Sequence, residues 1–97
     1  MTNVLIATIT AYCHCTVCCG PAATGLTAVG RAPRREHTIA APRLIPLGST
    51  VIVAGRRYTV EDRTHPRYDG RFDIYFKSHA EARRFGIRTN QVTVITK

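Results

Sequence analysis

The sequence predicts a mainly β domain, in which five or six strands and one short helix form a small closed or nearly closed barrel. The apolar segments are short, rich in β-branched residues and separated by Gly and Pro. A single segment carries both a start and a stop signal for a helix. With 97 residues, 44% of them hydrophobic, the chain suffices for one modest core, so residues 1–97 are expected to form a single domain.

The first half of the chain is typical of one strand followed by a long loop. Residues 3–12, NVLIATITAY, are rich in β-branched side chains and predict the first strand. From residue 13 to 36 the composition shifts to Cys, Gly, Pro, Ala and Arg without an apolar period, which predicts an irregular segment. Residues 37–41 predict a short strand, after which Pro42 and Pro46 require extended or turning backbone.

The middle of the chain predicts three strands. Residues 49–62, STVIVAGRRYTVED, predict a hairpin that turns at Gly55-Arg56, with the glycine as the first central residue of the turn. Residues 71–76, RFDIYF, alternate apolar and polar side chains. We therefore expect a strand with Asp73 on the face opposite to the apolar residues.

The last part of the chain predicts a helix and a closing strand. Ser78 and Glu81 form a capping box at the start of the helix, and Gly86 is a natural stop. Residues 91–96, QVTVIT, predict the strand that completes the sheet.

The chain is strongly basic. Lys and Arg number 14 against 6 Asp and Glu, which gives a formal net charge of +8 and favours anionic partners. No basic helix, zinc-finger spacing or aromatic RNA-binding signature accompanies this charge, so the sequence does not indicate a nucleic-acid-binding protein.

The N-terminal residues lack the pattern of a secretory leader, and no apolar stretch approaches the roughly 20 residues of a membrane span. The sequence therefore predicts a protein made in the cytoplasm without a signal peptide. We expect a monomer.

Acidic residues are concentrated between residues 61 and 76, which hold four of the six in the chain. A plain hairpin that set Asp62 opposite Asp73 would place Thr59 and Glu61 on the apolar face of the second strand, against the alternation of a sheet. A plain hairpin is therefore not expected, whereas a crossing connection inside a barrel could bring the two aspartates into one cleft.

Two readings of these aspartates follow from the sequence. In the first, apolar neighbours and the charge of Asp62 keep Asp73 protonated, which suits a general acid at a glycosidic oxygen. In the second, the aspartates join a solvated ionic cluster with nearby arginines, which would lower their pKa values. The members of that cluster would be Asp62, Asp69, Asp73, Arg63, Arg67 and Arg71.

Several motifs together resemble a known family. TITAY, CCG followed by ATG, TIAAPRLIPLGSTV, YTVEDR, GRFDIYF and SHAEARRFG occur in an order similar to the three-aspartate (3D) domain of bacterial cell-wall enzymes. That family includes the stationary-phase survival muralytic proteins and the catalytic part of membrane-bound lytic murein transglycosylase A. The resemblance spans about residues 8–95, and its most specific pieces are IPLG, the ED pair and the segment from FDIYF to FG.

The resemblance implies a six-stranded double-psi β-barrel that cleaves peptidoglycan between N-acetylmuramic acid and N-acetylglucosamine, leaving a 1,6-anhydro sugar. Attack by water, as in a related glycoside hydrolase, is the alternative outcome and gives ordinary hydrolysis. It places Asp73 as the general acid and then base, assisted by Asp62, and implies no cofactor for catalysis. Positions near the cleft that match the family are Thr10, Tyr12, Thr24 and Gly25, where hydroxyls and bare backbone would hold the substrate's sugar hydroxyls. Packing of strands and turns is the alternative role for these residues.

The chain departs from the family pattern in two places. The first aspartate of the family falls on Ala41, and the usual Gly-Gly-Ala-Ile-Lys-Gly loop is replaced by THPRYDG. A catalytically silent module that binds the cell wall or another polysaccharide is therefore the alternative function. Action at the bacterial cell wall, on peptidoglycan glycan strands, is the expectation in either case, and a short chain without a leader suits a phage lysis protein.

Cysteines are clustered directly after the first predicted strand. Cys13, Cys15, Cys18 and Cys19 all lie within seven residues of AYCHCTVCCG. A structural zinc ion bound by these thiolates, with help from His14 or His37, is one interpretation. Disulfides and unmodified thiols in a reducing cytoplasm are the others.

Overall fold

A computed structural model describes residues 1–13, 26–64, 67 and 70–97. The elements, in chain order, are β1 (Thr2–Tyr12), β2 (Thr38–Ala41), β3 (Thr50–Val53), β4 (Arg56–Arg63), β5 (Arg71–Tyr75), α2 (His79–Phe85) and β6 (Arg88–Ile95). Some predicted site residues lie outside the described part of the chain. They are His14, Cys15, Cys18, Cys19, Thr24, Gly25 and Asp69.

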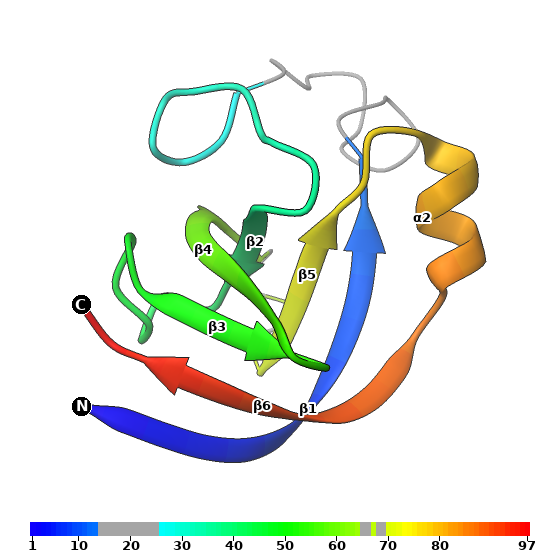
Figure 1. Cartoon of the computed structure of the whole chain (residues 1–97). Coiled ribbons are helices and arrows are strands. Elements are labelled where there is room, and N and C mark those ends of the chain that lie inside the picture. Colours follow the sequence, from blue (N-terminus) through cyan, green and yellow to red (C-terminus); the bar gives the residue numbers. More distant parts are fainter. Residues whose placement is uncertain (14–25, 65–66, 68–69) are drawn as a thin grey trace.

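The six strands close into a barrel in the order β1-β5-β2-β4-β3-β6. Strands β1 and β5 pair in parallel, as do β2 and β4, while the remaining neighbours are antiparallel. Figure 1 shows how β5 lies beside β1 although most of the chain separates them in sequence. The mainly β barrel with a short helix is confirmed, and its crossed parallel pairs distinguish it from a simple meander.

The core lies inside the barrel and draws on every strand. Phe72 and Ile74 of β5 are 2% and 3% exposed, and Asp73 between them faces the other way, as the alternation predicts. The buried apolar cluster consists of Ala7, Ile9, Ile39, Ala41, Val51, Val53, Tyr58, Val60, Phe72, Ile74, Val92 and Val94. Each Å² of apolar surface removed from water contributes about 25 cal/mol, so this cluster is the main stabilising element of the domain.

The turn of the β3–β4 hairpin is one residue earlier than the sequence analysis predicts. Val53 pairs with Arg56, so the two central residues are Ala54 and Gly55, with φ of 50° and 79°. Positive φ at both positions is the conformation of a type I′ turn, which matches the twist of the flanking strands. The prediction of Gly55 as the first central residue is therefore wrong, because Ala54 accepts the left-handed conformation.

Helix α2 begins and ends as predicted. The Ser78 hydroxyl accepts a hydrogen bond from the Glu81 amide at 3.2 Å, and Gly86 ends the helix with φ of 70°. The ring of Phe85, the last residue of this helix, lies 5.3 Å from the ring of Phe76, which precedes the helix. No helix among the described residues is long and apolar enough to cross a membrane.

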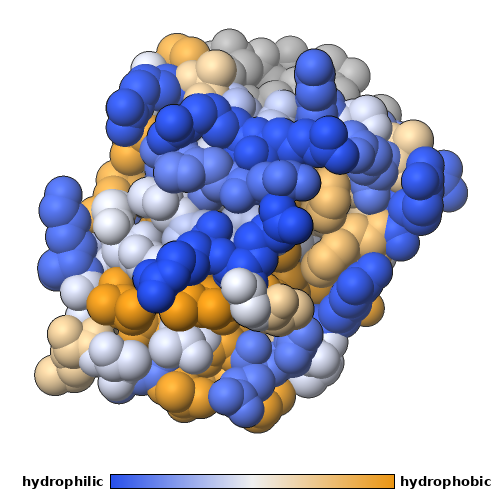
Figure 2. Space-filling view, viewed as in Figure 1, coloured by the Kyte–Doolittle hydropathy of each residue, from blue (hydrophilic) through white to orange (hydrophobic). Residues whose placement is uncertain are grey.

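The closing strand is longer than predicted. It begins at Arg88 rather than residue 91, and it pairs with β1 on one side and with β3 on the other. Figure 2 shows hydrophilic side chains over much of the upper face of the barrel in this view, in keeping with the basic composition.

Candidate active site

Strand β4 contains one extra residue opposite β2, and this residue changes the direction of Asp62. Ile39 of β2 pairs with Val60, but the next residue, Ala40, pairs with Asp62, so Glu61 has no counterpart in β2. Val60 and Glu61 are consequently both buried, against the alternation of a plain strand. Because the bulge shifts the register by one residue, Asp62 leaves the core-facing series of β4 and takes the face on which Ala40 lies.

The bulge completes a row of side chains across four adjacent strands, here named the carboxylate row. Thr10 of β1 pairs with Asp73 of β5, Asp73 pairs with Ala40 of β2, and Ala40 pairs with Asp62 of β4. The two aspartates therefore lie two strands apart, which corresponds to about 10 Å between their Cα atoms. Only the methyl group of Ala40 stands between them in the row.

Asp73 is partly buried in the barrel wall. The hydroxyl of Thr10 donates a hydrogen bond to its Oδ1 at 3.0 Å. Burial raises the pKa of Asp73 from 3.8 to about 6; the hydrogen bond from Thr10 opposes this increase, the charge of Asp62 adds to it, and the charge of Arg71 opposes it. Asp73 therefore exchanges a proton near neutrality, which is the property of a general acid and base.

Asp62 accepts hydrogen bonds from several parts of the fold. The Tyr12 hydroxyl donates to Oδ2 at 2.9 Å, and the amides of Ala28 and Arg63 donate to Oδ1 at 3.1 and 2.9 Å. Donors from strand β1, from the segment before β2 and from β4 itself thus fix one carboxylate. An oriented carboxylate of this kind provides a negative charge at a defined place beside Asp73.

Glu61 has a different environment from its neighbour. Its side chain is 7% exposed, and the Thr38 hydroxyl donates to Oε1 at 2.8 Å. The guanidinium of Arg34 lies 3.4 Å from Oε2, that of Arg31 lies 3.7 Å away and the ring of His37 lies 3.6 Å away. Burial acts to raise the pKa of Glu61, but the hydrogen bond from Thr38 and the charges of His37 and Arg34 outweigh it, so its pKa is lowered.

The reading of the aspartates as an ionic cluster does not describe Asp73. Within the described residues no ion pair involves this carboxylate, and its pKa moves upward rather than downward. Arg63, a predicted member of the cluster, instead donates to the backbone carbonyls of Pro42 and Ile45. Asp69 lies outside the described residues, so its part of the prediction is not tested.

Of the four predicted binding residues, Thr10 and Tyr12 lie in the described part of the chain, and Thr24 and Gly25 lie outside it. Thr10 and Tyr12 contact the carboxylates directly, as donors to Asp73 and Asp62. Ala41, the position of the missing family aspartate, is fully buried in the apolar cluster and so faces away from the carboxylate row. The resemblance alone could not indicate this direction.

The metal-site prediction rests largely on residues outside the described part. Cys13 is 2% exposed, with its sulfur 3.9 Å from Nδ1 of His79. Among the described residues, no group of three or more His, Cys, Asp or Glu side chains could hold a metal ion. His37, suggested as a zinc ligand, lies beside Glu61. A zinc site at Cys13, Cys15, Cys18 and Cys19 remains a prediction.

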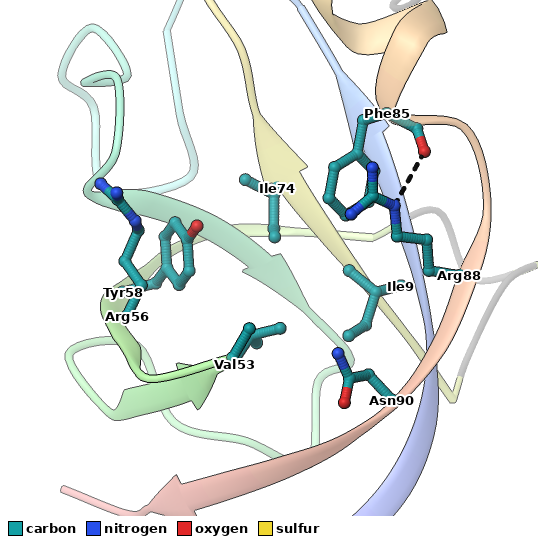
Figure 3. Close-up of a pocket in the computed structure, with 9 residues that line it drawn as sticks. Ile9, Val53, Arg56, Tyr58, Ile74, Phe85, Arg88 and Asn90 are labelled. Atoms are coloured by element: carbon teal, nitrogen blue, oxygen red, sulfur yellow. Dashed lines mark hydrogen bonds between the residues drawn. The ribbon is translucent and has the colours of Figure 1, made fainter.

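A cavity of about 110 Å³ lies on the other side of the barrel wall from the carboxylate row. Figure 3 shows Ile9 and Ile74 pointing toward it, and these residues alternate with Thr10 and Asp73 along the same strands. Arg88 lies at its edge, with its guanidinium 4.2 Å from the centre of the Phe85 ring. Neither aspartate lines this cavity, so the candidate chemistry belongs to the outer face of the wall.

Comparison with known proteins gives one informative relative. No family model matches the chain. The chain is 31% identical over 95 residues to the "Putative cell wall shaping protein YabE" of Bacillus subtilis (strain 168), an alignment that covers 96% of this chain and 23% of that protein. The chain thus spans less than a quarter of the length of this relative. The name assigns that protein to the shaping of the cell wall.

Sequence reasoning missed three participants in the site. Ala28 provides an amide to Asp62, Glu61 forms the bulge, and Thr38 holds Glu61. The sequence did contain one signal for the bulge: with regular alternation in both strands, Asp62 and Asp73 share a face only if Glu61 lies on the apolar face. A single bulge at Glu61 removes that conflict. Nothing in the local sequence indicated Ala28 or Thr38, which are brought to β4 only by the fold.

Proposed function

We propose that the domain cleaves the glycosidic bond between N-acetylmuramic acid and N-acetylglucosamine in peptidoglycan, with Asp73 as general acid and base. The observation that carries the proposal is that Asp73, whose pKa is raised to about 6, shares the carboxylate row with a second carboxylate. The sequence similarity to a protein named for shaping the cell wall supports a substrate in the cell wall, and the motif resemblance supports the type of reaction.

The proposed reaction uses the two oxygens of Asp73 differently. Oδ1 accepts the Thr10 hydroxyl, so the transferable proton is carried by Oδ2. Asp73 gives this proton to the bridging oxygen as the bond to C1 of the muramic sugar breaks, and positive charge develops at C1. The 6-hydroxyl of the same sugar then attacks C1 while its proton passes to the Asp73 carboxylate. The products are a 1,6-anhydro sugar and a glycan end with a free hydroxyl.

Asp62 has two roles in this scheme. Its negative charge adds to the increase in the pKa of Asp73, which raises the fraction of Asp73 that is protonated before reaction. The same charge, held by the Tyr12 hydroxyl and the backbone amides, stabilises the positive centre that develops on the sugar. The net charge of +8 would attract the domain to the anionic wall, with weaker attraction as salt rises.

The test compares purified chain and variants on isolated cell wall. Asp73→Asn keeps the shape of the side chain but removes the transferable proton, and we expect the release of soluble muropeptides to fall by roughly 10²–10⁴-fold. Asp62→Asn should reduce it by a smaller factor. Glu36→Gln is the matched control, because Glu36 is exposed and paired with Arg56 at 2.9 Å. Mass spectrometry identifies anhydro ends, and release at the parent rate by Asp73→Asn would refute the assignment.

A second candidate function is a catalytically silent module that binds the wall. The observation that favours it is Ala41, an apolar and fully buried residue where the resembled family has an aspartate. Such a module would sediment with cell wall but release no soluble products at any pH, which separates it from the enzyme in the same assay.

A further inference from the structure

The carboxylate of the bulge residue Glu61 is buried, and its hydrogen-bonding and charged partners come from a distant part of the chain, residues 31–38. Thr38, at the start of β2, is fully buried and donates to Glu61 at 2.8 Å. The same hydroxyl accepts the Arg34 amide at 2.8 Å, and the Arg34 guanidinium returns to Glu61 at 3.4 Å. Glu61 thus contacts the segment before β2 directly through the Arg34 side chain, and through the Thr38 hydroxyl it is linked to the Arg34 amide.

A compact turn at residues 27–31 is fixed by the same residue. The amide and hydroxyl of Thr27 both donate to the Arg31 carbonyl, at 2.8 and 2.9 Å, and the Gly30 amide returns to Thr27 at 2.9 Å. The Val29 amide donates to the backbone carbonyl of Glu61 at 3.2 Å, while the Arg31 guanidinium lies 3.7 Å from its carboxylate. The turn is therefore attached to β4 at the bulge.

The amide just before Val29 in this turn reaches the candidate active site. Ala28, adjacent to the residue that bonds to the Glu61 carbonyl, donates its amide to Asp62 at 3.1 Å. Since residues 61 and 62 are adjacent, anchoring the turn on the first sets the position of a donor to the second. We propose that Glu61 is a positioning residue, which holds the β4 bulge and the turn at residues 27–31 so that the Asp62 carboxylate is aimed into the carboxylate row.

The charges agree with this role. Arg31 and Arg34 have side chains that are 73% and 61% exposed, so each ion pair alone contributes little. The Glu61 carboxylate is 7% exposed, and removal of its charge leaves the two guanidinium groups without their common anionic partner. A bulge needs such an anchor, because its extra residue has no partner in the neighbouring strand.

The test uses Glu61→Gln, which keeps size and shape but loses the charge. Glu81→Gln is the matched control: Glu81 forms an ion pair with Arg35 at 3.0 Å, far from the bulge in sequence. We expect hydrogen exchange of the Ala28 amide, followed by NMR, to be at least about tenfold faster in Glu61→Gln and unchanged in the control. An Ala28 amide as protected as in the parent chain would overturn the proposal.

A second pair of variants guards against a folding defect. Thr38→Val removes the donor to Glu61 and should speed Ala28 exchange in the same way, whereas Thr38→Ser should restore the parent value. If valine and serine behave alike, the anchor is not the hydrogen bond and the proposal fails.

The effect on the wall-cleaving reaction rests on the proposed function and is measured separately. A misaimed Asp62 should lower kcat roughly tenfold to a hundredfold with KM changed less than about twofold, because the proposed role of its charge is to stabilise the transition state. If Ala28 exchanges faster in Glu61→Gln while Asp73→Asn cleaves at the parent rate, the positioning role is upheld and the proposed chemistry is overturned. If Ala28 exchange in Glu61→Gln stays at the parent rate while Asp73→Asn is inactive, the chemistry is upheld and the positioning role is overturned.

Discussion

Glu61 and Asp73 are two carboxylates of the same barrel wall whose pKa values move in opposite directions. Glu61 is the more buried of the two, 5% exposed, yet its pKa is lowered. Asp73 is only partly buried, yet its pKa rises to about 6. Burial acts to raise both pKa values: at Asp73 it prevails over the opposing Thr10 hydroxyl and Arg71 charge, whereas at Glu61 the Thr38 hydroxyl and the charges of His37 and Arg34 outweigh it. The exposed fraction of a carboxylate therefore does not by itself set the direction in which its pKa moves.

The comparison also separates support from candidate chemistry. A carboxylate that stays charged among cations is suited to holding a loop, and one that exchanges a proton near neutrality is suited to acid and base catalysis. The bulge at Glu61 connects the two functions, because the residue that carries the structural carboxylate is adjacent to Asp62. The predictions below test this separation.

The largest expected effect concerns the stability of Asp73→Asn. Because its folded pKa is raised above 3.8, Asp73 favours the fold in its protonated form, and this contribution is lost as pH rises from about 4 through about 6. The asparagine variant should therefore gain about 2.5 kcal/mol on the parent between pH 4 and pH 7.5. Urea unfolding at both values measures it. An equal difference at the two pH values would contradict the raised pKa.

Glu61→Gln should show the opposite sign. Since the folded pKa of Glu61 is lowered below 4.5, its charged form stabilises the fold above that value, and the contribution is lost as pH falls through the folded pKa. We expect a loss of about 1–2 kcal/mol at pH 7 that shrinks toward pH 3. The same unfolding series measures it, with Glu81→Gln as control. A loss that does not depend on pH would mean that packing, and not charge, holds the bulge.

The smallest effect is expected for Thr10→Val. The hydroxyl of Thr10 holds the pKa of Asp73 down, so its removal should raise that pKa further and cost about 1 kcal/mol of stability. If Asp73 is the general acid, the limb at which kcat/KM falls with rising pH moves to higher pH. Thr10→Ser should leave this limb in place. A limb that moves to lower pH in the valine variant would show that another group controls it.

Much of the fold follows from local patterns, and the site follows only in part. The alternation in residues 71–76 correctly placed Asp73 on the face opposite to Phe72 and Ile74, because a strand has a period of two. The capping box at Ser78 and Glu81 likewise predicted α2, since it depends on neighbouring residues alone.

What could not be predicted depends on contacts between distant segments. The order β5-β2-β4 puts Ala40 between the two aspartates, and no local signal specifies that a short strand will insert there. The hairpin turn was predicted one residue too late because alanine seldom adopts positive φ, so conformational propensity favoured Gly55 alone, whereas Ala54 does adopt it. The attachment of Arg31 and Arg34 to Glu61 bridges about thirty residues of chain, so only the closed barrel creates it.

The unpaired residue in β4 has an evolutionary consequence. In a barrel without it, Asp62 would point toward the hydrophobic interior, where a carboxylate is costly and selection would favour an aliphatic side chain. Insertion of a single codon into an ordinary strand is therefore enough to turn an acid outward, onto the face where β5, two strands away, already displays Asp73. Conversely, loss of that codon would convert a two-acid surface into a one-acid surface.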